Sequence, residues 1–334
     1  GTWIELHYGG NIQAYEQTTA RGYLSSIQPD VHFGLGAVTS VDSLCIKWPD
    51  GKMQVLRQVP ADQLLTVAHS EADNRWSPEY PRIAPLFHDI TRAAGIQYVH
   101  RDEDFVDFNI QKLLPHKLSE YGPALAAGDL DGNGLDDLVV GGSRFYSAQL
   151  FLQQPSGAFV SRALLPDASE QTKLGEDMGI VLFDADNDHD LDIYITSGGY
   201  ENESNGTAYA DKLFVNNGKG VFTIDSTALP ANYTSKSCVR AADFDKDGDL
   251  DLFVAGRVEP GAYPKPVSSA IYRNDSRPGK IAFTDVTSTA APMLNNIGLI
   301  ADAIWTDFNN DGWQDLVLAG EWMPLTFLQN VKGN

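Results

Sequence analysis

One acidic pattern occurs four times along the sequence and has the composition of a metal-binding loop. Its copies are residues 129–137, 184–192, 243–251 and 307–315, and oxygen-bearing side chains occupy positions 1, 3, 5 and 9 of each. Hard cations such as calcium bind several oxygen ligands at about 2.3–2.6 Å, which a tight loop can supply from side chains and from the backbone carbonyl of position 7. We therefore expect about four structural calcium ions. The predicted ligands are Asp129, Asp131, Asn133, Leu135 and Asp137; Asp184, Asp186, Asp188, Asp190 and Asp192; Asp243, Asp245, Asp247, Asp249 and Asp251; and Asp307, Asn309, Asp311, Trp313 and Asp315.

Neither an EF-hand nor a metal-free acidic cluster fits the pattern as well as this calcium loop. An EF-hand loop needs Glu at position 12 and a helix after it. Position 12 lies in a strand-like apolar run in every copy, as Val140, Ile195, Val254 or Leu318. A purely acidic surface cluster would have to hold 14 carboxylates at positions 1, 3, 5 and 9 of four tight loops without a cation. Because like charges at such short distances repel strongly, the sequence favours bound calcium.

The residues around each loop predict short β-strands that would hold it. A fully apolar run follows each copy directly, as in 138–140 and 193–195, and a second short run ending in amide side chains comes next. With one strand before the loop and one around a following Phe, each unit reads as four strands. The uniformly apolar second strand is expected to be buried on both faces. Units spaced 55, 59 and 64 residues apart predict an all-β fold, a β-propeller built of four-stranded blades with calcium loops.

The loops and their flanks resemble the FG-GAP/VCBS repeats of integrin α-subunit propellers and of bacterial surface proteins. Tyr121-Gly-Pro-Ala and Met178-Gly-Ile-Val stand where that family has its glycine-containing lead-in to the loop. The resemblance covers about residues 86–334 and implies a calcium-stabilised propeller, usually extracellular, in which calcium is mainly structural. Propellers of that family commonly have about seven blades, whereas this range holds about four. The blades therefore form either part of a larger propeller or a ring of four.

The first 70 residues contain no acidic loop and read as a small β-rich domain. Ile4, Leu6 and Tyr8 alternate with polar residues, which is typical of a strand. Segments 22–25, 32–36 and 41–51 resemble the ASPIC/UnbV domain, a module found with such repeats in cartilage acidic protein and in bacterial proteins. We therefore predict an ASPIC/UnbV-like domain at 1–70, a Pro-rich linker at 71–85 and propeller repeats at 86–334. Because that module normally follows a propeller, we expect flanking domains of a longer chain.

Composition narrows the class of partner. The formal net charge is −21 and the sequence pI about 4.5, so the chain would repel a phosphate backbone and nucleic acid is not expected. No stretch approaches the roughly 18 apolar residues of a membrane helix, so we expect no membrane insertion by this segment. Two cysteines, Cys45 and Cys238, exclude a disulfide framework; free thiols are favoured over a bridge between them.

The sequence holds no nucleophile elbow, phosphate loop or His-Glu zinc motif, so we expect a protein that is not an enzyme. If each acidic loop joins the first two strands of a blade, the next connection lies at the opposite end of the blade. Aromatic and charged residues gather in these connections and could bind a ligand by stacking and by Arg hydrogen bonds. This candidate ligand face consists of Arg144, Tyr146, Tyr200, Tyr209, Arg257, Tyr263, Glu321 and Trp322.

Together these patterns predict a calcium-binding propeller that acts as a non-catalytic binding or adhesion module for a glycan or protein partner. The resemblance implies an extracellular, cell-surface or periplasmic location, with a signal peptide outside this segment. Two alternatives stay open: a structural spacer in a large surface protein, and an enzyme domain acting on polysaccharides. The enzyme alternative persists because a pair of catalytic carboxylates that meets only in space is invisible in a sequence.

Overall fold

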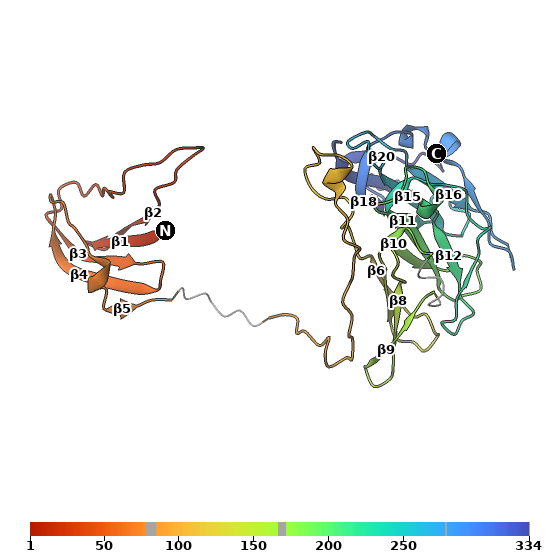
Figure 1. Cartoon of the computed structure of the whole chain (residues 1–334), viewed down its shortest axis with the longest axis horizontal. Coiled ribbons are helices and arrows are strands. Elements are labelled where there is room, and N and C mark those ends of the chain that lie inside the picture. Colours follow the sequence, from red (N-terminus) through yellow and green to blue (C-terminus); the bar gives the residue numbers. More distant parts are fainter. Residues whose placement is uncertain (78–84, 166–171, 278, 334) are drawn as a thin grey trace. The chain divides into compact units, whose positions relative to one another are not determined.

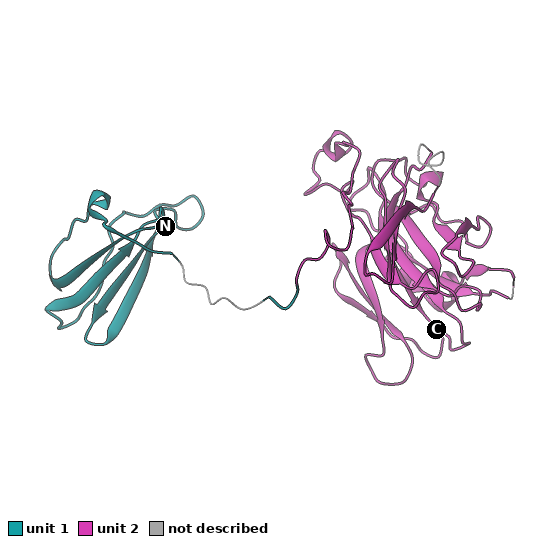
Figure 2. Ribbon diagram, turned by 90° about the horizontal axis from the view of Figure 1, so that it is seen from below, with its two compact units in different colours: residues 1–87 teal, residues 88–334 magenta. Residues whose placement is uncertain are grey.

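The chain forms two compact units, residues 1–87 and 88–334, in a computed structural model that describes residues 1–77, 85–165, 172–277 and 279–333 (Figure 2). Both units are built from antiparallel strands, which confirms the predicted all-β class. Within the described ranges, no helix is both long and apolar enough to cross a membrane. Residues 78–84 of the predicted linker lie outside the described residues.

The first unit is one five-stranded antiparallel sheet with the strand order β2-β1-β3-β4-β5. Its elements are β1 (Thr2–Tyr8), β2 (Asn11–Gln17), β3 (Ser40–Lys47), β4 (Lys52–Pro60), the 3-10 helix η1 (His69–Glu71) and β5 (Asn74–Arg75). Leu6, from the predicted alternating run, is buried in one cluster with Leu44 and Ile46 of β3. Since β5 pairs with β4, and the Trp76 indole N–H donates to the Trp48 carbonyl at 3.2 Å, this sheet extends past residue 70 into the segment expected to be linker.

The second unit contains four sheets in chain order, which we call blades 1 to 4 (Figure 1). In each blade, consecutive strands are hydrogen-bonded neighbours, as the repeat predicted; the described part of blade 4 has three strands. The strands are β6 (Leu125–Gly128), β7 (Asp137–Val140), β8 (Gln149–Gln153) and β9 (Phe159–Ala163) in blade 1; β10 (Glu176–Phe183), β11 (Asp192–Gly198), β12 (Lys212–Val215) and β13 (Thr223–Ile224) in blade 2; β14 (Ser235–Ala242), β15 (Asp251–Val258), β16 (Ala270–Asn274) and β17 (Phe283–Asp285) in blade 3; and β18 (Leu299–Thr306), β19 (Asp315–Glu321) and β20 (Thr326–Leu328) in blade 4. The short helices are η2 (Asp107–Asn109), η3 (Thr207–Tyr209), α2 (Thr287–Ala290) and η4 (Pro292–Leu294).

Neighbouring blades pack face to face through three apolar clusters, and the second strand of each inner blade serves two of them. On β11, Ile193 joins the cluster between blades 1 and 2, whereas Tyr194 joins the one between blades 2 and 3. On β15, Leu252 packs toward blade 2 and Phe253 toward blade 4. All four side chains are fully buried, which confirms the expectation that these apolar strands have no solvent face.

The strands place two sets of connections at opposite ends of the blades. Each acidic loop joins the first and second strands of its blade, as predicted. Because the strands are antiparallel, the connection between the second and third strands comes out at the other end. We call the first the loop end and the second the opposite end.

A segment before β6, residues 105–121, lies against the opposite end of later blades, and we call it the crossing segment. Its Leu114 and Leu118 are buried with Tyr200 of blade 2, Tyr263 of blade 3 and Leu299 of blade 4. Buried Asp107 holds the segment in shape by accepting the backbone N–H groups of Leu118 at 2.6 Å and of Ser119 at 3.0 Å. The sequence pattern did not predict this segment.

Candidate functional site

The carboxylate at position 1 bends three of the four acidic loops by accepting backbone N–H groups from within them. In blade 1, Asp129 accepts the N–H of Gly132 at 2.9 Å and of Gly134 at 2.8 Å. Asp184 accepts the position 6 N–H of its loop at 2.9 Å, and Asp307 does so at 2.8 Å. The same turn therefore forms in loops with different intervening residues.

Position 6 has a positive φ in all four loops, including the one that lacks glycine there. Gly134, Gly248 and Gly312 have φ of 82°, 105° and 88°, and His189 has 74°. The His189 side chain is 93% exposed, so its imidazole points to solvent. This residue completes the turn at the conformational cost that glycine avoids.

The aspartate at position 9 joins three strands of its own blade. In blade 2, buried Asp192 accepts the N–H of Ala185 at 2.9 Å and, through its other oxygen, the N–H of Asn216 at 2.8 Å. Asp137, Asp251 and Asp315 accept the two equivalent N–H groups, at 2.7 to 3.2 Å. The ninth carboxylate is thus a structural part of every blade as well as a candidate metal ligand.

Three of the four loops bring carboxylates from positions 1, 3 and 9 together, with one oxygen of each within 4.8 Å of the others. The clusters are Asp129, Asp131 and Asp137; Asp184, Asp186 and Asp192; and Asp243, Asp245 and Asp251. The position 5 carboxylates, Asp188 and Asp247, are not part of these clusters. The side chain at position 5 accepts the N–H of position 7, at 2.8 Å for Asn133 and 3.1 Å for Asp188. The predicted ligand set is therefore assembled in part.

The acidic loops of blades 2 and 3 contain carboxylate oxygens that are buried without a hydrogen-bond partner among the described residues. These atoms are the Oδ1 atoms of Asp186 and Asp243, which belong to the clusters, and of Asp190 and Asp249, which stand at position 7. A buried acceptor without a partner costs about 1–3 kcal/mol, and more when it is charged. A bound dication would coordinate such oxygens. The number of carboxylates, their type and their oxygens without partners therefore fit a calcium site.

The pKa values of the carboxyl groups also indicate that these loops favour a bound cation. Burial raises the pKa of Asp192 and Asp251 to about 7, even though backbone N–H bonds act against the shift. Burial followed by the charges of neighbouring aspartates raises the pKa of Asp190 to about 6 and of Asp249 to about 7. Both causes disfavour the ionised form, and a dication at the centre of the loop would oppose both.

The fourth loop keeps the turn but has a weaker set of donors. Asn309 replaces the carboxylate at position 3 and donates to Asp311 at 3.0 Å. The ammonium group of Lys246, from the loop of blade 3, lies 4.3 Å from the centre of the Trp313 ring. This loop has two carboxylates at positions 1, 3 and 9, where the other loops have three, and it has a cation beside it, so it is the poorest of the four candidates for calcium.

At the opposite end, half of the predicted ligand face is buried. Tyr200, Tyr209, Arg257 and Tyr263 have at most 6% of their surface exposed, so they cannot offer a stacking surface to a partner. This corrects the expectation from the sequence. Their physical role is packing: the Tyr200 hydroxyl donates to Gln111 of the crossing segment at 3.0 Å.

The remaining members of that face differ in exposure. Trp322 is 75% exposed and Tyr146 40% exposed. Arg144 pairs with Glu103 at 3.0 Å and lies over the Phe145 ring. Only part of the predicted face is therefore open to a partner.

Glu321 is the centre of a polar cluster at this end. It accepts the Tyr263 hydroxyl at 2.7 Å, pairs with Arg257, and lies 3.2 Å from His116 of the crossing segment. Burial alone would raise the pKa of Glu321, but its hydrogen bonds with Tyr263 and Arg257 outweigh that and lower it. No local pattern pointed to His116, because its partner lies about 200 positions away in the sequence.

Known families match both units of the chain. The family described as ASPIC and UnbV matches residues 1–74, and the family described as FG-GAP-like repeat matches residues 118–195 and 199–254. The matched repeats include the three loops whose carboxylates cluster. A comparison with curated proteins found no match. The fold, the repeated loops and both matches agree, and the chain is an FG-GAP repeat protein with an ASPIC/UnbV domain at residues 1–74.

Proposed function

We propose that this protein is a calcium-stabilised, non-catalytic binding module that works outside the cytoplasm, at a cell surface or in a secreted or periplasmic protein. Calcium would hold the loop end of the blades rigid, and the opposite end would contact a glycan or protein partner. The observation that carries the calcium part is the presence of three carboxylate clusters, two of which contain buried oxygens without a partner among the described residues.

The affinity expected of such loops supports the proposed location. Calcium sites of extracellular modules have dissociation constants of about 10⁻⁴–10⁻³ M, which suits partly exposed loops in calcium-rich surroundings. Asp131, Asp186 and Asp245, the position 3 residues, are only partly buried, so their ligand sites are open to exchange with solvent. FG-GAP repeats typically occur in extracellular or surface proteins, which supports the same assignment.

The non-catalytic part rests on how the polar groups at the opposite end are used. Glu321 engages both its oxygens, one with Arg257 and one with Tyr263, and its lowered pKa keeps it ionised at neutral pH. A carboxylate in that state does not serve as a general acid. The pairing of Glu321 with Arg257 and Tyr263 makes this surface rigid, and a rigid surface suits the binding of a partner.

Calorimetry tests the calcium assignment directly. Protein stripped of metal with EDTA and then dialysed should bind three to four calcium ions on titration, and its melting temperature should rise in calcium. One ion at 100 times its dissociation constant stabilises the folded state by about 2.7 kcal/mol. A triple variant with Asp131, Asp186 and Asp245 changed to Asn should lose most of the binding heat.

The matched control changes three exposed aspartates outside the loops, Asp30→Asn, Asp62→Asn and Asp104→Asn, which removes the same charge. It should bind calcium like the wild type. No binding heat and an unchanged melting temperature in the wild type would refute the calcium assignment. Equal losses in both triple variants would show a diffuse charge effect, which contradicts the site assignment as well.

A further inference from the structure

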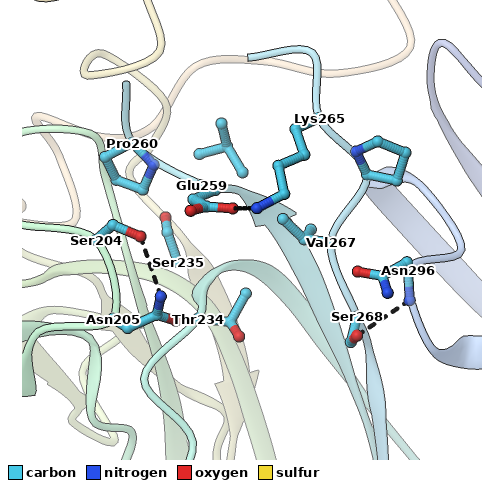
Figure 3. Close-up of a pocket in the computed structure, with 12 residues that line it drawn as sticks. Ser204, Asn205, Thr234, Ser235, Glu259, Pro260, Lys265, Val267, Ser268 and Asn296 are labelled. Carbon is cyan, nitrogen blue, oxygen red and sulfur yellow. Dashed lines mark hydrogen bonds and ion pairs between the residues drawn. The ribbon is translucent and has the colours of Figure 1, made fainter. Parts of the chain in front are cut away.

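A pocket of about 150 Å³ opens at the opposite end of the blades, where three consecutive blades meet (Figure 3). Blade 2 contributes Ser204 and Asn205, from the connection between β11 and β12. Blade 3 contributes Thr234 and the connection between β15 and β16. Asn296, directly before β18, completes the wall. The acidic loops lie at the other end of the blades, so the pocket is separate from the calcium clusters.

The wall of the pocket carries polar groups that the protein itself leaves unused. The Thr234 hydroxyl makes no hydrogen bond with any described residue. Ser204 accepts a hydrogen bond from the Asn205 amide at 3.1 Å, and its own O–H remains available. The Asn296 amide donates to Asn295 at 3.2 Å, which leaves the Asn296 carbonyl oxygen available as an acceptor. Donors and acceptors therefore face one small volume from opposite sides (Figure 3).

The two asparagines of the wall have the left-handed backbone conformation, with φ of 56° at Asn205 and 52° at Asn296. Asparagine tolerates this conformation better than most residues, but the conformation still restricts where the side chain can point. Two such residues on opposite sides of one pocket give it a fixed polar lining. Side chains that are already fixed lose less conformational entropy when a ligand binds, so less of the binding energy is needed to offset that loss.

The pocket is electrically neutral and has apolar groups beside its polar ones. Its two charged side chains, Glu259 and Lys265, pair with each other, so the lining carries no net charge. Pro260 is half-buried and Pro266 is exposed, so their rings present C–H groups to the pocket, whereas Val258 and Val267 are buried behind the lining. A ligand that matches this lining has hydroxyl groups around its edge, C–H groups on a face and no charge.

Size restricts the ligand further. Pockets for drug-sized ligands measure about 300–1,000 Å³, so a pocket of about 150 Å³ takes one ring and not a chain. An uncharged pyranose has equatorial hydroxyl groups and an apolar C–H face, and it meets all of these conditions. A terminal sugar of a glycan could enter the pocket while the rest of the glycan stays in solvent.

We propose that this pocket binds one neutral pyranose ring, with Thr234 and Ser204 on one side of the sugar and Asn296 on the other. The inference rests on the binding role proposed above and names the ligand class and the site for it. The exposed indole of Trp322 is a competing surface for the same kind of ligand, and the experiment separates the two.

Ligand-observed NMR on the full chain in saturating calcium tests the proposal. The probes are methyl β-glucopyranoside, methyl β-galactopyranoside, methyl α-mannopyranoside and N-acetylglucosamine, with sorbitol as an open-chain polyol and methyl β-glucuronide as a charged ring. At least one neutral pyranoside should bind with a dissociation constant of about 1 mM, equivalent to about −4 kcal/mol. Sorbitol and the glucuronide should bind at least tenfold more weakly.

Two variants each remove one polar group of the lining. Thr234→Val and Asn296→Ala should each raise the dissociation constant of the sugar about tenfold, the expected effect of one lost hydrogen bond. Thr223→Val, the same change on exposed strand β13, should bind like the wild type. Each variant must show the calcium-dependent melting temperature of the wild type, which separates failure of this pocket from failure of the calcium proposal.

Three results would overturn the pocket assignment. The first is the absence of binding by every neutral pyranoside in protein that still responds to calcium. The second is binding that both Thr234→Val and Asn296→Ala leave unchanged. The third is binding that Trp322→Ala abolishes and the pocket variants retain, which would move the sugar to the indole surface.

Discussion

At the scale of single residues, the carboxylates of the acidic loops have two different roles: some stabilise the blade directly, and others stabilise it only when a cation is bound. Asp192 and its equivalents are buried and accept backbone N–H groups from two other segments, so they support the blade whether or not a cation is bound. Asp186 has a buried oxygen without a partner among the described residues, and burial raises its pKa. Without a cation, its ionised carboxylate therefore destabilises the folded state. Substitutions should separate these two roles.

The first prediction compares Asp192→Asn with Asp186→Asn by calorimetry in EDTA and in calcium. Asp192→Asn turns one acceptor into a donor facing a backbone N–H, so it should lower stability by about 1–3 kcal/mol even in EDTA. Asp186→Asn removes a buried charge, so it should maintain or raise stability in EDTA and reduce the gain from calcium. If both variants lost the same stability in EDTA, the proposed division of roles would be wrong.

A second prediction concerns Glu176, which is 4% exposed and lies with Glu201 against Gly199. Burial, and then the charge of Glu201, raises the pKa of Glu176. The folded state therefore retains a proton that the unfolded chain releases above its ordinary pKa of about 4.3, so stability should fall as pH rises. The slope can reach about 1.4 kcal/mol per pH unit.

Glu176→Gln keeps the shape and cannot titrate. Denaturation with urea should show this variant close to the wild type at pH 5 and more stable than the wild type at pH 8. Glu203→Gln, an exposed change in the same blade, should follow the wild type at both pH values. A Glu176→Gln protein with the pH dependence of the wild type would contradict the prediction.

At the scale of strands, the amide at the end of the third strand joins consecutive blades. The Asn216 amide donates to the Leu130 carbonyl in the loop of blade 1 at 2.8 Å. Asn274 and Asn330 make the equivalent bonds to the loops of blades 2 and 3, at 3.3 and 2.7 Å. A turn of one blade is thereby tied to a strand of the next, beside the candidate calcium cluster.

The third prediction removes one of these ties. Asn216→Ala removes the amide donor from two carbonyl groups, in one buried and one partly buried hydrogen bond, and should lower the free energy of unfolding by about 2–3 kcal/mol in urea denaturation. Asn217→Ala provides the control, because the Asn217 side chain accepts N–H groups only from its own turn, at 3.1 and 3.3 Å. A larger loss for Asn217→Ala would argue against the tie.

Local features of the fold could be predicted from the sequence. The loops follow from contacts within nine residues, and the strands follow from apolar runs, so spacing alone was enough to place both. The burial of Tyr200 and Tyr263 was not predictable, because both pack on Gln111 and Leu114 in a segment with no periodic pattern. A residue that is buried by a distant irregular segment looks like a surface residue in its own local sequence.

At the scale of the whole molecule, calcium should act on one unit only. All three carboxylate clusters found in the described ranges lie in residues 88–334, and the sheet of residues 1–76 has a separate apolar core. The two units should therefore respond differently to the metal.

The fourth prediction is that differential scanning calorimetry of the full chain resolves two transitions, of which calcium raises only one. A protein consisting of residues 88–333 alone should show the calcium-sensitive transition at the same temperature. One shared transition that moves as a whole would instead mean that the two units unfold together.

The crossing segment has a consequence for how the chain assembles during synthesis. Gln111 bonds Tyr263 across 152 positions, and Tyr121 bonds Glu321 across 200. Residues 105–121 are therefore synthesised long before their partners in blades 3 and 4, and the cluster that buries Leu114 and Leu118 is complete only when Leu299 of blade 4 has been made. This segment is synthesised early but completes its packing late. A pause in translation before β19 would therefore leave those two leucines accessible to a chaperone.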